Sequence, residues 1–121
     1  MKYVVCLQHI FKSMIKKENF NAQDQSLAEL ARTLSHPARI AILNFLASSA
    51  SCISGDISDE IPLSRTTVSQ HLQELKRAGL IIGEIDGVRV NYCLNPTRIK
   101  EVSRMFRDYF NKLEDYQSNC C

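Results

Sequence analysis

The sequence has no long apolar run, little net charge, and few glycines and prolines. Its 121 residues include four glycines and three prolines, and 15 basic side chains offset 13 acidic ones to leave a formal net charge of +2. No segment approaches the roughly 20 consecutive apolar residues needed to cross a bilayer. A membrane protein is therefore not expected, and the small net charge gives only weak support for a polyanionic partner.

Recognisable catalytic motifs are also missing. The chain shows no nucleophile with its base, no carboxylate pair in a pocket, no phosphate loop and no catalytic metal set. Its length fits one domain with a single hydrophobic core and leaves no room for a separate catalytic lobe. We therefore predict one globular domain that is not an enzyme.

The N-terminal segment and the cysteines bear on location. Gln8, His9 and Lys12 interrupt the apolar stretch of the first 20 residues, and no small-residue cleavage site follows. We therefore expect no secretory signal and a cytoplasmic protein. The five cysteines form an odd, irregularly spaced set, which suits reduced thiols better than a disulfide framework. They are Cys6, Cys52, Cys93, Cys120 and Cys121.

Apolar periodicity predicts a mainly helical protein. Amphipathic helices are expected over residues 3–17, 25–34 and 37–47, with a linker at 19–24. Pro37 suits a first helical position, and the helix after it is expected to bury Ile40, Leu43 and Leu46. Met14 is an alternative start codon. A short helix over residues 54–60 and a turn at Ile61 and Pro62 precede the next periodic segment.

That next segment, from Ser64 to a stop at Gly79, has a distinctive polar face. Val68, Leu72 and Leu75 share its apolar side. The other side carries groups that can donate to phosphates or read base edges, with Arg65 suited to guanine or phosphate. These side chains are Ser64, Arg65, Thr66, Thr67, Ser69, Gln70 and Gln73.

Two β-rich runs and a last helix complete the chain. Residues 80–85 and 88–94 flank Asp86-Gly87, a pair typical of a two-residue hairpin turn. A hairpin after a helix-turn-helix is a wing, so we predict a winged helix-turn-helix fold, mainly α with a small β-hairpin. From Pro96 a helix repeats apolar residues at three- and four-residue steps, a face that favours dimerisation through the terminal helices. Those residues are Ile99, Val102, Met105, Phe106, Tyr109, Phe110 and Leu113.

The expected organisation therefore has three parts. Residues 1–20 are an N-terminal amphipathic helix or extension, 21–95 are the DNA-binding domain, and 96–121 are a C-terminal dimerisation helix with a cysteine tail. Two-fold symmetry would place two recognition helices about 34 Å apart, one turn of DNA, and predicts an inverted-repeat operator. Contacts with DNA should avoid residues 21–60, which carry two basic and five acidic side chains.

Three stretches of the chain carry a recognisable pattern, namely LSHPARIAIL, LSRTTVSQHLQELKRAGLI and EIDGVRVNYCLNP. Together they resemble the ArsR/SmtB family of metal-responsive winged-helix repressors. The resemblance covers about residues 25–117, with its elements in family order and spacing. It implies a homodimeric repressor that sits on a double-stranded DNA operator and leaves it when an inducer binds.

The resemblance also assigns residues to the DNA surface. Ser64, Arg65, Thr66, Ser69, Gln70 and His71 fall where the family's recognition helix faces DNA, and Arg89 falls on the wing. Two readings of His71 remain, a DNA contact or a hydrogen-bonded histidine at the inner face. Arg39 could hold a phosphate or form a surface salt bridge, and Ser64 is also expected to cap its helix.

The family's inducer sites match this chain incompletely. The zinc-type site on the last helix needs histidines, and none follows His71. At the arsenic-type site Cys52 is present, but Ser54 stands where a second thiol would be useful. The adjacent Cys120 and Cys121 could ligate As(III) or Sb(III), with Cys6 or Cys52 as the third thiolate. A frayed tail, a small half-buried Cys52 and redox sensing are the alternatives, and Cys93 is expected in the core.

No cofactor is required by this interpretation. The alternatives to an induced repressor are a winged-helix regulator with redox sensing or with no small ligand, and a winged-helix module that docks a protein through its polar-faced helix. DNA binding would weaken steeply with salt, whereas a protein-docking module would show only a weak salt dependence.

Overall fold

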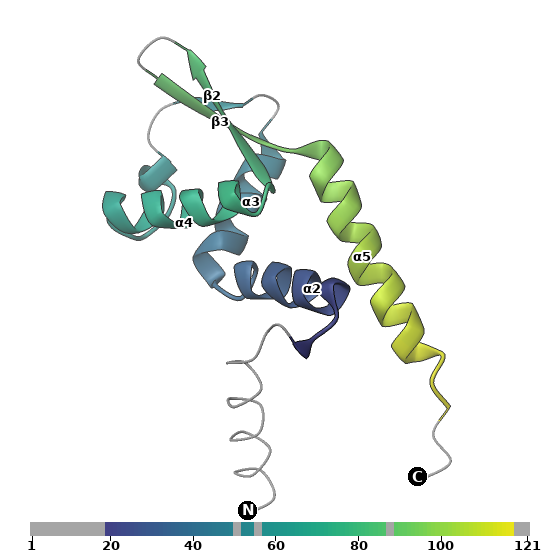
Figure 1. Cartoon of the computed structure of the whole chain (residues 1–121). Coiled ribbons are helices and arrows are strands. Elements are labelled where there is room, and N and C mark those ends of the chain that lie inside the picture. The colour runs from purple at the N-terminus through teal and green to yellow at the C-terminus, as the bar shows by residue number, and fades with distance from the viewer. Residues whose placement is uncertain (1–18, 50–51, 55–56, 87–88, 118–121) are drawn as a thin grey trace, which may run out of the picture.

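The computed structural model describes residues 19–49, 52–54, 57–86 and 89–117 of the chain. The elements follow the order helix, helix, short strand, 3-10 turn, helix, hairpin, helix (Figure 1). They are α2 (Ala22–Thr33), α3 (Pro37–Ser48), β1 (Ile53–Ser54), the 3-10 turn η2 (Ile57–Asp59), α4 (Arg65–Arg77), β2 (Ile81–Asp86), β3 (Arg89–Leu94) and α5 (Pro96–Glu114). The predicted winged helix-turn-helix fold is confirmed. The expected helix at 3–17, Met14, Cys6, Cys120 and Cys121 lie outside the described residues.

The first two described helices begin at side-chain caps. Asn21 Oδ1 accepts a hydrogen bond from the backbone N–H of Gln23 at 2.7 Å, so α2 starts inside the segment expected to be a linker. At α3, His36 Nδ1 accepts from the N–H of Ala38 at 3.1 Å, and Pro37 stands in the first turn as predicted. A capping residue thus decides each start.

Helix α3 buries only part of the expected face. Leu46 is buried as predicted and Leu43 packs partly buried against the core, whereas Ile40 is 40% exposed and Ala38 and Ile42 are buried in its place. The sequence PARIAILNFLAS is apolar on several sides, so its periodicity does not select one stripe. Packing against α4 and the sheet makes that choice.

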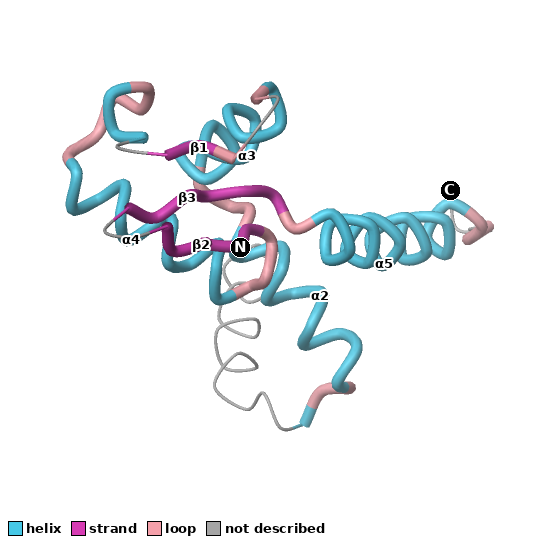
Figure 2. Tube along the Cα trace, turned by 90° about the horizontal axis from the view of Figure 1, so that it is seen from above, coloured by secondary structure: helices cyan, strands magenta, loops and turns pink. Residues whose placement is uncertain are grey.

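The sheet has three antiparallel strands in the order β1-β3-β2 (Figure 2). Strands β2 and β3 form the wing and pair from Ile81 with Leu94 to Asp86 with Arg89. Their connection therefore falls on residues 87 and 88, outside the described residues, one position later than the expected Asp86-Gly87 turn. The short helix expected over 54–60 is found only as the 3-10 helix η2 at Ile57–Asp59. Ser54 belongs to strand β1 instead, because Ile53 and Ser54 pair with residues of β3 that are distant in sequence.

The core lies where α2, α3 and α4 meet the inner face of the sheet. Ile42, Leu75, Leu80 and Ile81 are fully buried. They are joined in one cluster by apolar side chains from the remaining elements, namely Leu30, Leu46, Ile57, Ile61, Val68, Leu72 and Val102. This cluster fixes α4 between α3 and the wing.

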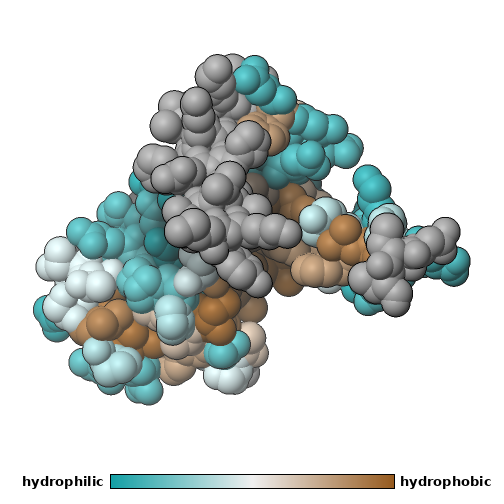
Figure 3. Space-filling view, turned by 90° about the horizontal axis from the view of Figure 1, so that it is seen from below, coloured by the Kyte–Doolittle hydropathy of each residue, from teal (hydrophilic) through white to brown (hydrophobic). Residues whose placement is uncertain are grey.

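Helix α5 leaves the body of the molecule after its first turns (Figures 1 and 2). Val102 is buried, and Ile99, Met105 and Phe106 are partly buried against the core. Further along, Tyr109, Phe110, Leu113 and the following Tyr116 are exposed. Hydrophobic surface, brown in Figure 3, extends from the body toward the C-terminal end of the chain. None of the helices in the described ranges combines the length and apolar character needed to cross a membrane.

Candidate nucleic-acid interface

Ser64 is the N-cap residue of helix α4. Ser64 Oγ accepts a hydrogen bond from the backbone N–H of Thr67 at 3.3 Å and lies 2.9 Å from Thr67 Oγ1. Ser64 thus satisfies a backbone N–H of the first turn, as the sequence indicated, and the Thr67 hydroxyl bonds to the Ser64 hydroxyl. No acidic side chain occupies that turn. The positive end of the helix dipole is therefore available to an anion such as a phosphate.

One face of α4 presents five polar side chains to solvent. Positions 65, 69 and 73 follow one another at four-residue steps, and positions 66 and 70 do the same beside them, so the five side chains form one broad row along the helix. The row, called here the α4 polar face, consists of Arg65, Thr66, Ser69, Gln70 and Gln73, all exposed. The structure brings these predicted site residues together with Ser64 at the beginning of the same helix.

The opposite face of α4 holds it in the molecule. Val68, Leu72 and Leu75 are 2%, 7% and 0% exposed and belong to the core cluster. The polar face therefore rests on a packed helix, and its side chains project from a fixed support.

His71 belongs to the buried face. It is 8% exposed, so the structure separates it from the row of DNA-facing residues to which the family resemblance assigned it. Its Nδ1 accepts a hydrogen bond from Arg39 Nε at 3.2 Å, and its ring lies 4.3 Å from the ring of His36. This arrangement corresponds to the structural reading of His71.

Arg39 joins three helices. Besides its bond to His71 of α4, its Nη1 donates to the carbonyl oxygen of Thr33 at the end of α2, at 3.1 Å. Arg39 itself lies in α3. Its guanidinium therefore links helices. Neither interpretation from the sequence, a phosphate contact or a surface salt bridge, predicted this role.

A pKa shift follows from the position of His71. Burial lowers the pKa of its imidazole, and His36 and the positive charge of Arg39 lower it further, while Glu74 acts in the opposite direction. A neutral ring is also what the bond from Arg39 requires, because Nδ1 must have a free lone pair to accept it. Nε2 then carries the proton and has no hydrogen-bond partner among the described residues.

Helix α4 ends at Gly79, which has a φ of +81°. The N–H of Leu80 bonds to the carbonyl of Leu75 at 3.1 Å, and that of Gly79 to the carbonyl of Lys76 at 2.9 Å. This pair of bonds is a Schellman motif, and the contact between Leu75 and Leu80 in the core completes it. The predicted stop at Gly79 is confirmed, and it turns the chain directly into the wing.

The wing follows within three residues of the end of α4. Arg89 opens β3 opposite Asp86, while the placement of its side chain lies outside what the structure describes. The predicted role of Arg89 in DNA binding stays a prediction. Around α4, Asp59 and Glu60 are exposed before the helix begins, and Glu74 pairs with Arg77 near its end. The polar face itself carries no acid.

Two of the five cysteines form a disulfide. Cys52 and Cys93 are bonded, with their Cα atoms 4.6 Å apart. The expectation that all five thiols are reduced is therefore wrong for this pair. The core position expected for Cys93 is also wrong. Tyr92 and Leu94 pack against the core, so Cys93, between them on the strand, lies on the other face of the sheet. Cys52 is exposed, and while bonded its sulfur cannot act as a thiolate ligand. The described ranges contain no group of three His, Cys, Asp or Glu residues that could hold a metal ion.

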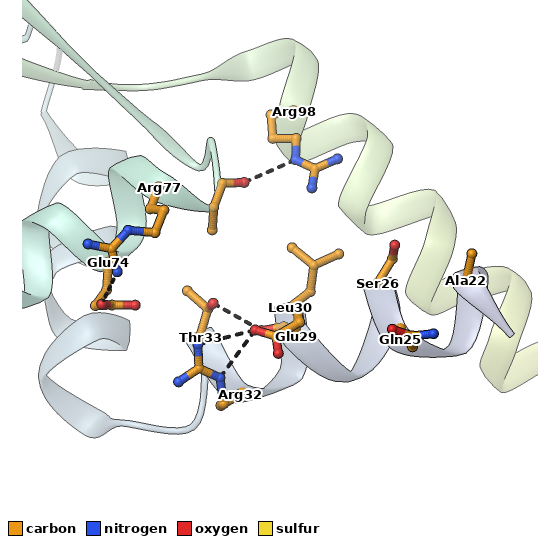
Figure 4. Close-up of a pocket in the computed structure, with 11 residues that line it drawn as sticks. Ala22, Gln25, Ser26, Glu29, Leu30, Arg32, Thr33, Glu74, Arg77 and Arg98 are labelled. Carbon is orange, nitrogen blue, oxygen red and sulfur yellow. Dashed lines mark hydrogen bonds and ion pairs between the residues drawn. The ribbon is translucent and has the colours of Figure 1, made fainter. Parts of the chain in front are cut away.

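An open pocket of about 470 Å³, with several charged side chains at its edge, lies away from the polar face, between α2, the end of α4 and the start of α5 (Figure 4). Each arginine at its edge already has a partner. Arg32 pairs with Glu29, Arg77 with Glu74, and Arg98 with Glu101. Arg98 Nε also donates to the carbonyl of Ala78 at 3.1 Å, which ties α5 to the end of α4.

The known proteins that this chain resembles are helix-turn-helix transcriptional regulators. A family profile described as a helix-turn-helix domain matches residues 34–84. An uncharacterized HTH-type transcriptional regulator of Methanocaldococcus jannaschii, MJ1325, is 31% identical over 81 residues, which are 67% of this chain and 91% of that protein. The HTH-type transcriptional repressor SmtB of Mycobacterium tuberculosis is 42% identical over 66 residues, 54% of this chain and 48% of that one.

Solved structures agree on the fold. An ArsR-like transcriptional regulator from Rhodococcus sp. RHA1 superposes with a TM-score of 0.65, over 78% of this chain and 88% of that chain, at 21% sequence identity. At that identity the likeness speaks for the fold alone. It includes the helix-turn-helix and the hairpin that carry the candidate interface.

Proposed function

Since this chain belongs to the ArsR/SmtB family of winged helix-turn-helix transcriptional regulators, we propose that it acts as a homodimeric repressor bound to an inverted-repeat operator in double-stranded DNA. Its site of action would be the cytoplasm, where the operator is. The observation that carries the proposal is the α4 polar face, which is exposed, free of acids and mounted on a buried apolar face.

The residues of that face suit two kinds of contact. Ser64 and Thr66, at the start of α4, can donate to phosphate oxygens beside the helix N-terminus and so set its position on the duplex. Gln70 and Gln73 carry amides that can bond adenine edges in the major groove, and Arg65 can bond guanine O6 and N7. Arg89 would add a backbone contact from the wing.

The test is binding to the DNA upstream of the protein's own gene, followed by fluorescence anisotropy. Arg65→Ala and Gln70→Ala should each raise Kd by about 5- to 150-fold, the range for losing one specific base contact. Gln23→Ala is the matched control, because Gln23 is also an exposed glutamine on a helix but lies on α2. It should bind as the unaltered protein does.

Salt dependence separates DNA binding from protein docking. Kd should rise steeply with salt because phosphate neutralisation releases counterions. Equal affinity for upstream and scrambled duplexes, with a flat salt dependence, would instead favour a protein-docking module. Repression is tested separately with a reporter, whose expression should increase when the gene is deleted.

Dimerisation would use the exposed apolar residues of α5. Tyr109, Phe110, Leu113 and Tyr116 are 41%, 53%, 50% and 73% exposed, while the stripe nearer the start of the helix packs on the protein's own core. A second copy of the chain would cover the exposed residues, because one protomer covers only the part of the apolar stripe near the start of α5. Two recognition helices would then meet successive major grooves about 34 Å apart.

An inducer is part of the proposal at the cysteine tail. Cys120 and Cys121 can supply two thiolates to As(III) or Sb(III), with Cys6 as the third because Cys52 is bonded to Cys93. As(III) should release the DNA complex, and the release should vanish in Cys120→Ser/Cys121→Ser. If As(III) still releases the DNA from that double variant, the inducer site does not lie at the cysteine tail.

A further inference from the structure

We propose that Cys52 and Cys93 are a reversible thiol–disulfide site whose closed form holds the recognition helix and the wing in the DNA-binding arrangement. This redox clasp, meaning the Cys52–Cys93 pair, rests on the proposed function only for its effect on DNA. The formation of the bond itself is independent of that function. The oxidant is a two-electron acceptor of the hydroperoxide class.

The backbone places the two cysteines opposite each other. Ile53 pairs with Tyr92 and Ser54 with Asn91 in antiparallel register, so the next pair outward is Cys52 with Cys93. Their Cα separation of 4.6 Å falls within the range that a disulfide spans. The same strand pairing therefore keeps the two thiols close after reduction, as long as β1 stays on β3.

The pair is open to reagents. Cys52 is exposed, and Cys93 is half-buried on the outer face of the sheet. Ile82, which pairs with Cys93 from the neighbouring strand β2, is 42% exposed. An oxidant can therefore reach Cys52 without unfolding the core, and Cys93 is placed to complete the bond.

The closed loop contains the DNA-reading part of the fold. Between Cys52 and Cys93 the chain forms β1, η2, α4, β2 and the first residues of β3. Ile57 and Ile61, which connect β1 to α4, are 2% and 5% exposed and belong to the core. A cross-link at the ends of this segment therefore restrains both the approach to α4 and the second strand of the wing.

Without the bond, β1 is held by the packing of Ile53 against the core and by its pairing with β3. It contributes only two residues to the sheet, and so short a pairing is marginal by itself. Reduction should therefore release β1 from the wing strand β3 part of the time, while Ile57 and Ile61 stay in the core. Apparent affinity falls with the fraction of protein in the binding-competent arrangement, so the oxidised form should bind DNA more tightly.

The chemistry balances in two steps. The Cys52 thiolate attacks one peroxide oxygen, the O–O bond breaks, and Cys52 becomes a sulfenic acid, while the released alkoxide or hydroxide takes up the proton that the Cys52 thiol had lost and leaves as an alcohol or water. The Cys93 thiolate then attacks the Cys52 sulfur, the S–S bond forms, and the hydroxide released takes up a proton to leave as water. Two thiols lose two electrons and two protons. A dithiol reverses the reaction by thiol–disulfide exchange.

Peptide mapping tests the bond in the full-length protein. Trypsin should release residues 40–65, which contain Cys52, and residues 90–98, which contain Cys93. After treatment with hydrogen peroxide the two peptides should appear linked, and after a dithiol they should appear separately. This readout is specific to the pair, whatever Cys6, Cys120 and Cys121 do.

Amide hydrogen exchange tests the clasp without DNA. The backbone amides of residues 53 and 54 should exchange more slowly in the oxidised protein than in the reduced one. In anisotropy measurements, reduction should weaken operator binding by about 5- to 150-fold, the usual range of coupling between two sites. Failure of both redox forms to bind DNA would count against the proposed function, while peptide mapping and exchange would still decide the clasp.

Variants assign the response to the pair. Cys52→Ser should show the reduced-state affinity with or without peroxide, and because Cys52 is exposed this variant should fold. Cys93→Ser should behave in the same way. Cys120→Ser/Cys121→Ser, which leaves the pair intact, should keep the response to peroxide.

Three results would overturn the proposal. The first is the absence of linked peptides after oxidation. The second is a linked pair with the same exchange at β1 and the same DNA affinity in both redox states. The third is tighter operator binding by the reduced protein.

Discussion

His71 supports α4 only while its ring is neutral. Its pKa is lowered first by burial and then by His36 and Arg39. Protonation would remove the lone pair that accepts the bond from Arg39 Nε and would place a second positive charge beside the guanidinium. The buried imidazole therefore couples protein stability to pH.

The sign of that coupling is set by the lowered pKa. Above about pH 6.5 the ring is neutral in both the folded and the unfolded chain, and its stabilising contribution is fully present. As pH falls, the unfolded chain takes up the proton first, so the free energy of unfolding decreases. We predict that His71→Gln, which cannot titrate, loses less stability than the unaltered protein between about pH 7.5 and 5.5 in urea denaturation.

An NMR titration of the His71 ring provides a direct check. Its midpoint should lie below the usual histidine value of about 6.5. A midpoint at or above that value, together with equal pH slopes for the two proteins, would contradict the prediction.

At the scale of elements, the junction of α4, β2 and α5 is tightly defined. Gly79 ends α4 in a left-handed conformation, and the Arg98 side chain of α5 packs over it while donating to Ala78. Arg98 therefore links α5 to the end of α4. Under the proposed function, this contact would be a physical route by which the C-terminal helix influences DNA binding.

Gly79→Ala tests the junction. A Cβ would lie 3.4 Å from Arg98 Cγ, so the main penalty comes from the φ of +81°. We expect a loss of about 1 to 2 kcal/mol in the free energy of unfolding, measured by urea denaturation. Gly79→Asn should lose less, because asparagine tolerates this conformation better. Equal losses for the two variants would point to the contact with Arg98 as the cause.

At the scale of the whole molecule, the exposed apolar residues in the far half of α5 are the proposed dimer contact. Leu113→Glu would place a charge in the exposed apolar stripe, where a dimer would have to bury it. We predict that this variant sediments as a monomer near 13.8 kDa under conditions in which the unaltered protein is a dimer.

The matched control adds the same charge outside the stripe. Asn111→Glu changes an exposed residue that is not one of the apolar side chains of α5, and it should remain dimeric. A monomeric unaltered protein, or dissociation of both variants alike, would argue against α5 as the interface.

Local signals determined much of this protein from sequence alone. Pro37 and Gly79 mark a helix start and a helix stop through their backbone preferences. Apolar residues that recur at three- and four-residue steps in α4 separated Val68, Leu72 and Leu75 from the polar face, because a helix of 3.6 residues per turn places such positions on one side. The fold class and the exposed candidate site follow from such short-range rules.

Only the tertiary structure decided the long-range pairings. His71 and Ile40 could each have faced inward or outward by periodicity, and packing of α3 against α4 buried the first and exposed the second. Cys52 and Cys93 are 41 residues apart in sequence, and they meet because β1 pairs with β3. No local pattern reports such a meeting, since it depends on where the folded core brings two distant strands together.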